Sequence, residues 1–135
     1  MQELTLAAKL ENVAAVTEFV DGLLEDALCP LKAQMQIDVA IDELFSNIAR
    51  YAYNGGEGEA TVKVDFIDDP RQVSITFIDS GIPYNPIEQE DPDITLSAED
   101  RKIGGLGIFI VKKTMDDISY QHKDGQNILT IKKKI

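Results

Sequence analysis

The sequence of 135 residues contains one cysteine, Cys29, so no disulfide can form within the chain. A small secreted domain stapled by disulfides is therefore excluded. The first residues, MQELTLAAKLENV, carry acids where a signal peptide needs a basic region followed by an apolar run, and no apolar stretch approaches the length of a membrane span. We therefore expect a cytoplasmic protein that does not associate with a membrane.

Basic residues are also scarce. Thirteen Lys and Arg face 24 Asp and Glu, which gives a net charge of −11. Such a chain repels phosphate backbones and anionic lipid at long range, so direct binding to nucleic acid is disfavoured, although a local basic patch could still hold a phosphorylated ligand. The length fits one domain covering residues 1–135.

Hydrophobic periodicity predicts the order of the elements. Apolar residues recur at helical spacing in two adjacent segments, and they alternate with polar residues in several shorter ones. We expect an edge strand at 2–8, helices at 10–28 and 31–53, strands at 60–66 and 73–77, a polar loop at 82–102, a helix at 108–115, and strands at 118–123 and 128–134. This order predicts an α+β fold, a two-layer α/β sandwich whose mostly antiparallel sheet carries helices on one face.

The common phosphate-binding motifs are absent: there is no G-x-x-x-x-G-K-[ST] loop, and Ile110 stands where G-x-G-x-x-G would need its third glycine. Instead, Gly104-Gly105-Leu106-Gly107 precedes the short helix, with Arg101 and Lys102 just upstream. Free backbone N–H groups at a helix N-terminus attract anions, and the two basic side chains would add contacts to phosphate. A flexible hinge with a close helix–sheet approach explains the glycines equally well.

The strand at 73–77 runs into DSGIPYNP, which begins at Asp79. Because side chains alternate along a strand, Asp79 should face the helices together with Val73, Ile75 and Phe77. A carboxylate there needs donors. Either Asp79 accepts from nearby backbone N–H groups in an Asx-turn helped by Gly81, or it accepts from a ligand amino group. In the second case Gly81, which has no Cβ, would let backbone and a flat ring come close.

The second helix carries Glu43 and Asn47, four residues apart and therefore neighbours on one helix face. They fall at the border between the apolar stripe and the polar side of the helix, where polar side chains can line a cleft. Alternatively, Glu43 faces solvent and Asn47 has no functional role. The sole histidine, His122, is expected on the surface of a strand.

The order of these three motifs resembles the GHKL ATPase superfamily, which includes the ATP-binding domains of gyrase, heat-shock chaperones and histidine kinases. Glu43-x-x-x-Asn47 is similar to its N box, and Asp79-x-Gly81 and Gly105-x-Gly107 to its two glycine boxes. Tyr51-Ala52-Tyr53, DSGIPYNP and GGLGIFIVKKTMDDISY look like the branch of bacterial anti-sigma-factor serine/threonine kinases. The resemblance covers nearly the whole chain, with Tyr51 where family members often have histidine.

The resemblance implies a Bergerat-type ATP-binding fold with a mixed sheet, and it implies a role for each motif. Asn47 would bind Mg²⁺ through its side-chain oxygen, Asp79 would accept from the adenine amino group, and Glu43 would be the general base. The glycine segment Gly104–Gly107 would hold the phosphates, and residues 87–103 would form a lid over ATP.

The implied function is an anti-sigma-factor kinase that uses ATP and Mg²⁺ to phosphorylate a small antagonist protein on serine or threonine and that sequesters a sigma factor. Family members tend to be homodimers. A non-catalytic nucleotide-binding module, which regulates a partner by contact alone, is the alternative. A detached histidine kinase domain is disfavoured because no dimerisation helix carrying a phosphoacceptor histidine is present.

Overall fold

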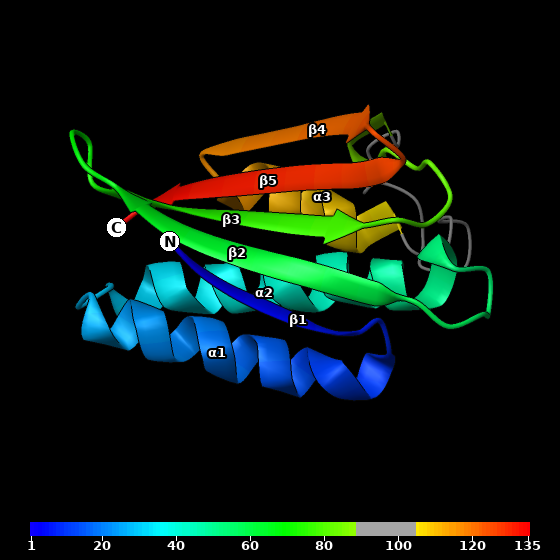
Figure 1. Cartoon of the computed structure of the whole chain (residues 1–135). Coiled ribbons are helices and arrows are strands. Elements are labelled where there is room, and N and C mark those ends of the chain that lie inside the picture. The colour runs from blue at the N-terminus through cyan, green and yellow to red at the C-terminus, as the bar shows by residue number, and fades with distance from the viewer. Residues whose placement is uncertain (89–104) are drawn as a thin grey trace.

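The computed structural model describes residues 1–88 and 105–135 (Figure 1). Within these residues, two long helices and a short one are combined with five strands, in the order expected from the sequence. The elements are β1 (Gln2–Ala7), a 3-10 turn η1 (Leu10–Asn12), α1 (Val13–Asp26), α2 (Leu31–Asn47), a π-helical turn η2 (Ile48–Ala52), β2 (Glu59–Ile67), β3 (Gln72–Asp79), a 3-10 turn η3 (Pro86–Glu88), α3 (Gly105–Thr114), β4 (Asp117–Lys123) and β5 (Gln126–Lys134).

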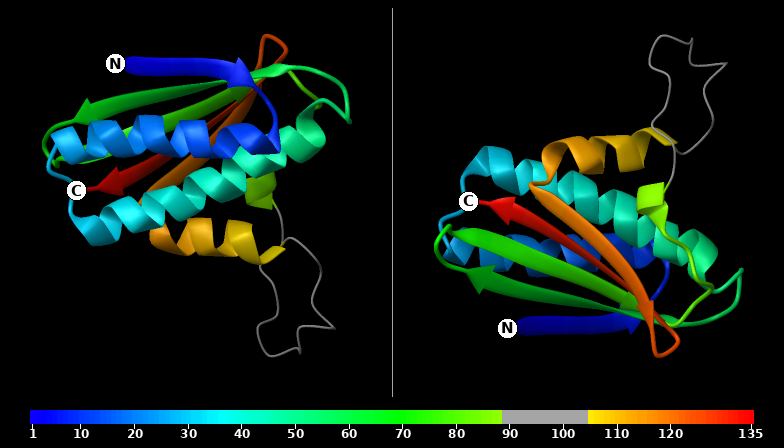
Figure 2. Two further views of the ribbon diagram at one scale, coloured as in Figure 1. Left: turned by 90° about the horizontal axis from the view of Figure 1, so that it is seen from below. Right: turned by 90° about the horizontal axis from the view of Figure 1, so that it is seen from above.

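The strands form a five-stranded sheet in the order β1-β2-β3-β5-β4. All three α-helices cover one face of this sheet, with α2 between α1 and α3 (Figure 2). This arrangement confirms the α+β two-layer sandwich. Each of the four strand pairings is antiparallel, so the described sheet is antiparallel throughout rather than mixed.

The core lies between the sheet and the helices. Period-two alternation brings Val73, Ile75 and Phe77 of β3 inward, each 1% exposed, and the 3.6-residue period of α2 brings Ile37 and Phe45 to meet them. Phe45 and Phe77 are the largest fully buried side chains. The strand that ends at Asp79 is therefore a core strand, as its alternation predicts.

Two helix boundaries differ from the sequence prediction. The helix expected at 31–53 is α-helical only to Asn47 and then widens into the π-helical turn η2, before Asn54 (φ 49°) and Gly55 (φ 81°) end it. Such wide turns are often found at functional sites. The second difference is that α3 begins at Gly105 instead of residue 108, so Gly105 and Gly107 lie in its first turn rather than in a preceding loop.

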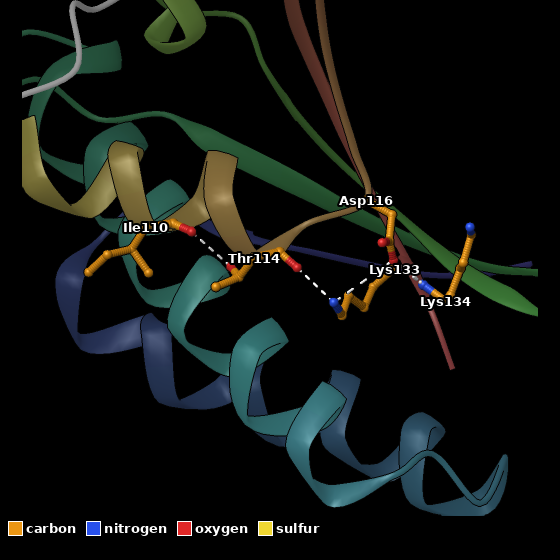
Figure 3. Close-up of polar contacts among 5 residues, drawn as sticks. All are labelled: Ile110, Thr114, Asp116, Lys133 and Lys134. Carbon is orange, nitrogen blue, oxygen red and sulfur yellow. Dashed lines mark hydrogen bonds and ion pairs between the residues drawn. The ribbon is translucent and has the colours of Figure 1, made fainter.

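The C-terminal end of α3 is tied to the sheet (Figure 3). Lys133 on β5 donates to the Thr114 carbonyl (2.7 Å), which places a cation at the negative end of the helix. Asp116 lies 3.9 Å from the Lys133 ammonium and accepts from the Lys134 backbone N–H (2.7 Å). At the other end of α3, Gly107 lies against Glu43 of α2.

The end of α2, the end of β3, the turn η3 and the start of α3 gather at one end of the molecule in both figures. His122 is exposed on β4, as expected. The sequence has three acids close together at Glu88, Glu90 and Asp91; of these the structure describes only Glu88, which is exposed. No helix within residues 1–88 and 105–135 combines the length and apolar character needed to cross a membrane.

Candidate functional site

Asp79 ends β3 on the helix side of the sheet and is 6% exposed. Its Oδ1 atom accepts from the backbone N–H of Gly81 (2.9 Å) and from the side-chain amide of Asn127 (2.9 Å). The Asx-turn considered from the sequence is therefore present. No donor among the described residues reaches Oδ2, which leaves one carboxylate oxygen for a ligand, so the two interpretations of this motif are compatible.

Asn127 is the residue that sequence reasoning missed. It lies directly opposite Asp79 in the β3–β5 pairing and is also 6% exposed. Counting back by two from the inward-facing Ile131 and Leu129 leads to Asn127, so the same alternation that placed Asp79 would have placed it. The sequence prediction began this strand at Ile128, two residues after its observed start at Gln126, and so excluded Asn127.

Gly81 is required by the backbone of η2. A Cβ atom added at Gly81 would lie 2.1 Å from the Ala52 carbonyl oxygen, and the next residue, Ile82, donates its N–H to that oxygen (2.7 Å). The close approach expected at Gly81 is thus made by Ala52. The phenol of Tyr53 strengthens this junction by accepting from the Ser80 N–H (2.9 Å).

A small cavity of about 50 Å³ opens between these elements. Both Asn47 and Asp79 line it, so the structure brings the first and second motifs together. Typical ligand pockets hold about 300–1,000 Å³, so only part of a nucleotide could enter unless side chains at its edge move. The polar residues of the lining are Asn47, Asp79 and Asn127. The other lining residues are apolar or aromatic: Leu44, Ile48, Tyr51, Ala52, Phe77, Ile82, Tyr84, Pro86, Tyr120 and Leu129.

Glu43 and Asn47 meet on one face of α2, as their spacing predicts. The Asn47 amide nitrogen donates to Glu43 Oε1 (3.3 Å), and no donor among the described residues reaches Asn47 Oδ1. Burial raises the pKa of the Glu43 carboxyl, while the Asn47 hydrogen bond and the charge of Arg50 oppose that rise. Glu43 does not line the cavity and is connected to it through Asn47.

The first turn of α3 packs directly on Glu43. A Cβ atom added at Gly107 would lie 2.1 Å from Glu43 Oε2, so only glycine fits beside this carboxylate in its present position. Gly105 begins the helix, and the Leu106 side chain is 44% exposed. Arg101, Lys102 and Gly104, together with most of the expected lid, lie outside the described residues.

The sequence matches the histidine kinase-like ATPase domain family over residues 6–133, which is nearly the whole chain. The chain belongs to this family. This domain therefore contains the three motifs of the resemblance. Its fold is the antiparallel sheet with helices on one face.

Curated relatives of this ATPase domain are protein kinases. The chain is 28% identical over 132 residues to the serine-protein kinase RsbW of Listeria monocytogenes, a match that covers 96% of the chain and 84% of the relative. It is 29% identical over 100 residues to the serine/threonine-protein kinase BtrW of Bordetella bronchiseptica (74% and 70%). Among solved structures, the Acinetobacter baumannii histidine kinase AdeS aligns with 99% of the chain and 68% of its own length, at 16% identity and a TM-score of 0.48.

The side chains of this ATPase domain fit a magnesium nucleotide. Asp79 offers a carboxylate oxygen, Oδ2, that accepts from no donor among the described residues, and Asn47 offers an amide oxygen, which is a suitable hard ligand for Mg²⁺. Within residues 1–88 and 105–135 there is no cluster of three or more His, Cys, Asp or Glu that could hold a metal ion. A magnesium ion held by one amide and by phosphate oxygens is consistent with that finding, because Mg²⁺ often binds through few protein ligands.

Proposed function

We propose that this chain is an ATP-dependent protein serine/threonine kinase of the anti-sigma-factor type. It binds ATP and Mg²⁺, phosphorylates a small anti-sigma antagonist protein, and sequesters a sigma factor, thereby regulating transcription. The observation that carries the proposal is the shared cavity of Asp79 and Asn47, with Glu43 one helical turn away. The serine kinases among its relatives support the same reaction class.

Each binding residue has a distinct task in this proposal. Asp79 Oδ2 accepts a hydrogen bond from the exocyclic amino group of adenine. Asn47 Oδ1 coordinates Mg²⁺, and the backbone N–H groups of Gly105, Leu106 and Gly107 at the start of α3 hold phosphate, with Gly104, Arg101 and Lys102 as further predicted contacts. Bound Mg²⁺ neutralises charge that develops on the phosphates during transfer.

Glu43 is the proposed general base. Its carboxylate takes the proton of the serine or threonine hydroxyl as the hydroxyl oxygen bonds to the γ-phosphorus, and the bond from that phosphorus to the bridging oxygen of ADP breaks. Burial raises the pKa of Glu43, which strengthens it as a proton acceptor once it is ionised. The adjacent Asn47 holds one carboxylate oxygen and places the base beside the metal.

The net charge of −11 supports a basic protein partner. A basic segment of a sigma factor is such a partner, and its capture would not require nucleic acid or a membrane. We also propose that the chain forms a homodimer in the cytoplasm.

A non-catalytic nucleotide-binding module remains the second candidate, and one observation favours it. Glu43 Oε1 accepts from the Asn47 amide, and Oε2 lies against Gly107 in the first turn of α3. In that position the Glu43 carboxylate must either move or be approached by the substrate hydroxyl from its one open side. In this case the chain would regulate its partner through contact alone.

The two candidates separate when the chain is incubated with γ-labelled ATP and candidate antagonist proteins. A kinase transfers label to serine or threonine of one of them, and Glu43→Gln abolishes the transfer. Asp42→Asn, which alters the neighbouring exposed acid, serves as the matched control and should retain transfer. Tight ATP binding without any labelled protein would support the binding module.

A further inference from the structure

The buried amide of Asn127 uses all of its hydrogen-bonding capacity. Its nitrogen donates to Asp79 Oδ1 (2.9 Å) and to the Ile82 carbonyl (3.0 Å). Its oxygen accepts from the Tyr84 backbone N–H (3.2 Å) and from the Tyr120 hydroxyl. An amide side chain offers two N–H donors and two acceptor positions, so each is occupied.

These partners determine which way the amide faces. The Ile82 carbonyl can only accept and the Tyr84 N–H can only donate, so exchanging the nitrogen and oxygen of Asn127 would break both bonds. The N–H side of Asn127 must therefore face Asp79. Its bonds to Ile82, Tyr84 and Tyr120 prevent the amide from rotating to present its oxygen to Asp79.

The orientation of Asn127 determines how Asp79 can act. Donors from Asn127 and Gly81 converge on Oδ1, which fixes the plane of the carboxylate and leaves Oδ2 free of donors from the described residues. Phe77 and Leu129 line the same cavity and have no side-chain donor, so this oxygen is open to a donor that a ligand brings. The site therefore favours a ligand that brings an N–H group.

We propose that Asn127 determines base specificity by holding Asp79 as a hydrogen-bond acceptor. The pair thereby selects a purine with an amino group at C6 over a purine with a carbonyl oxygen there. Asn127 is a positioning residue in this role, because it acts through Asp79. The inference rests on the proposed function, in which Asp79 binds the nucleobase.

Replacing Asn127 by Asp tests the inference with little change in shape. Two carboxyl groups 2.9 Å apart cannot both be ionised, so they share a proton and the pair can donate as well as accept. We expect the ratio of the Kd for ITP to the Kd for ATP, measured by titration calorimetry, to fall by about tenfold or more relative to the wild type.

Thr130→Val is the matched control. Thr130 lies on the same strand, β5, and its hydroxyl is paired with that of Thr76 on β3 (3.0 Å), but it does not line the cavity. Its removal takes one side-chain hydrogen bond from the same pair of strands. The ratio of Kd values should stay at the wild-type value.

Tyr120→Phe provides a milder second variant in case Asn127→Asp does not fold. It keeps the ring and removes one donor to the Asn127 oxygen, so the ratio should fall by about two- to threefold. An unchanged ratio in a folded Asn127→Asp protein, or in Tyr120→Phe if the first variant is unfolded, overturns the inference. A wild-type chain that binds neither nucleotide refutes the proposed function instead.

Discussion

Two carboxylate–asparagine pairs in this molecule have the same chemistry but different settings. The strand pair, Asp79 and Asn127, bridges β3 and β5 with a 2.9 Å hydrogen bond, and both residues are 6% exposed. The helix pair, Glu43 and Asn47, spans one turn of α2 with a 3.3 Å hydrogen bond, and both residues are half-buried. The strand pair is fixed by two strands and a turn, whereas the helix pair is held mainly by its own helix.

The difference suits two different tasks. A side chain that recognises a nucleobase works best when its orientation is fixed. A wrong ligand then leaves a polar group of the site without a hydrogen bond and binds more weakly. A general base must exchange a proton and therefore needs access and a suitable pKa. The rigid strand pair is suited to selection and the more open helix pair to chemistry, and substitutions can test this division.

The largest expected effect is on the helix pair. Glu43→Gln keeps the shape and the contact with Asn47 but removes the proton acceptor, so phosphoryl transfer should fall by about 10²–10⁴-fold. The Kd for ATP should stay within about twofold, because Glu43 does not line the cavity. Single-turnover transfer and calorimetric titration measure the two quantities. A large loss of ATP affinity would mean that the two pairs do not have separate tasks.

Gly81 tests how rigidly the strand pair is supported. Gly81→Ala places a Cβ atom 2.1 Å from the Ala52 carbonyl oxygen, a backbone atom that cannot move alone, so we expect a loss of about 1–3 kcal/mol in the free energy of unfolding. Gly22→Ala is the matched control. No atom lies within 4 Å of the new Cβ on the exposed face of α1, and alanine there should stabilise the chain by about 0.5–1 kcal/mol. Denaturant unfolding of both variants gives the comparison, and equal effects would contradict it.

Gly107 tests the corresponding support of the helix pair. A Cβ atom at Gly107 would meet the end of the Glu43 side chain, which can rotate away, so Gly107→Ala should leave stability nearly unchanged. Displacing the carboxylate should still reduce transfer, by about tenfold. Loss of stability as large as that of Gly81→Ala would show that the two sites are equally rigid. Transfer assays and thermal unfolding of the same preparation distinguish these outcomes.

The sequence predicted what depends on local periodicity. The alternation in β3 placed Asp79 on the inner face, and the four-residue spacing placed Glu43 beside Asn47. The helices, the strands and their order followed from the same patterns. These relations lie within one element, so a single sequence contains them.

The missed features depend on contacts between distant elements. Asp79 and Asn127 become partners only through the pairing of β3 with β5, 48 residues apart, and one sequence does not show which strands pair. The contact of Gly107 with Glu43 likewise depends on how closely α3 packs on α2. The π-helical turn η2 was missed because its residues continue the helical spacing of α2.

A third acidic site, away from both pairs, tests whether burial and neighbouring charge set the pKa of a carboxyl group in this fold. Asp38 on α2 contacts Asp21 on α1, and Glu25 adds further negative charge. Burial, a hydrogen bond with Asp21 and these charges raise the pKa of Asp38 to about 7 from 3.8. Neither Asp21 nor Asp38 lines the cavity of the strand pair.

The raised pKa means that the folded chain binds a proton which the unfolded chain releases between about pH 4 and pH 7. Stability from this site is therefore present below about pH 4 and is lost as pH rises through 7. Asp38→Asn should remove this dependence and raise the free energy of unfolding at pH 8 by about 1 kcal/mol. Denaturant unfolding across this range measures it, with Asp42→Asn as the exposed control on the same helix. A wild-type chain that gains stability between pH 5 and pH 8, with Asp38→Asn following the same curve, would show that neither burial nor the neighbouring charge controls this carboxyl.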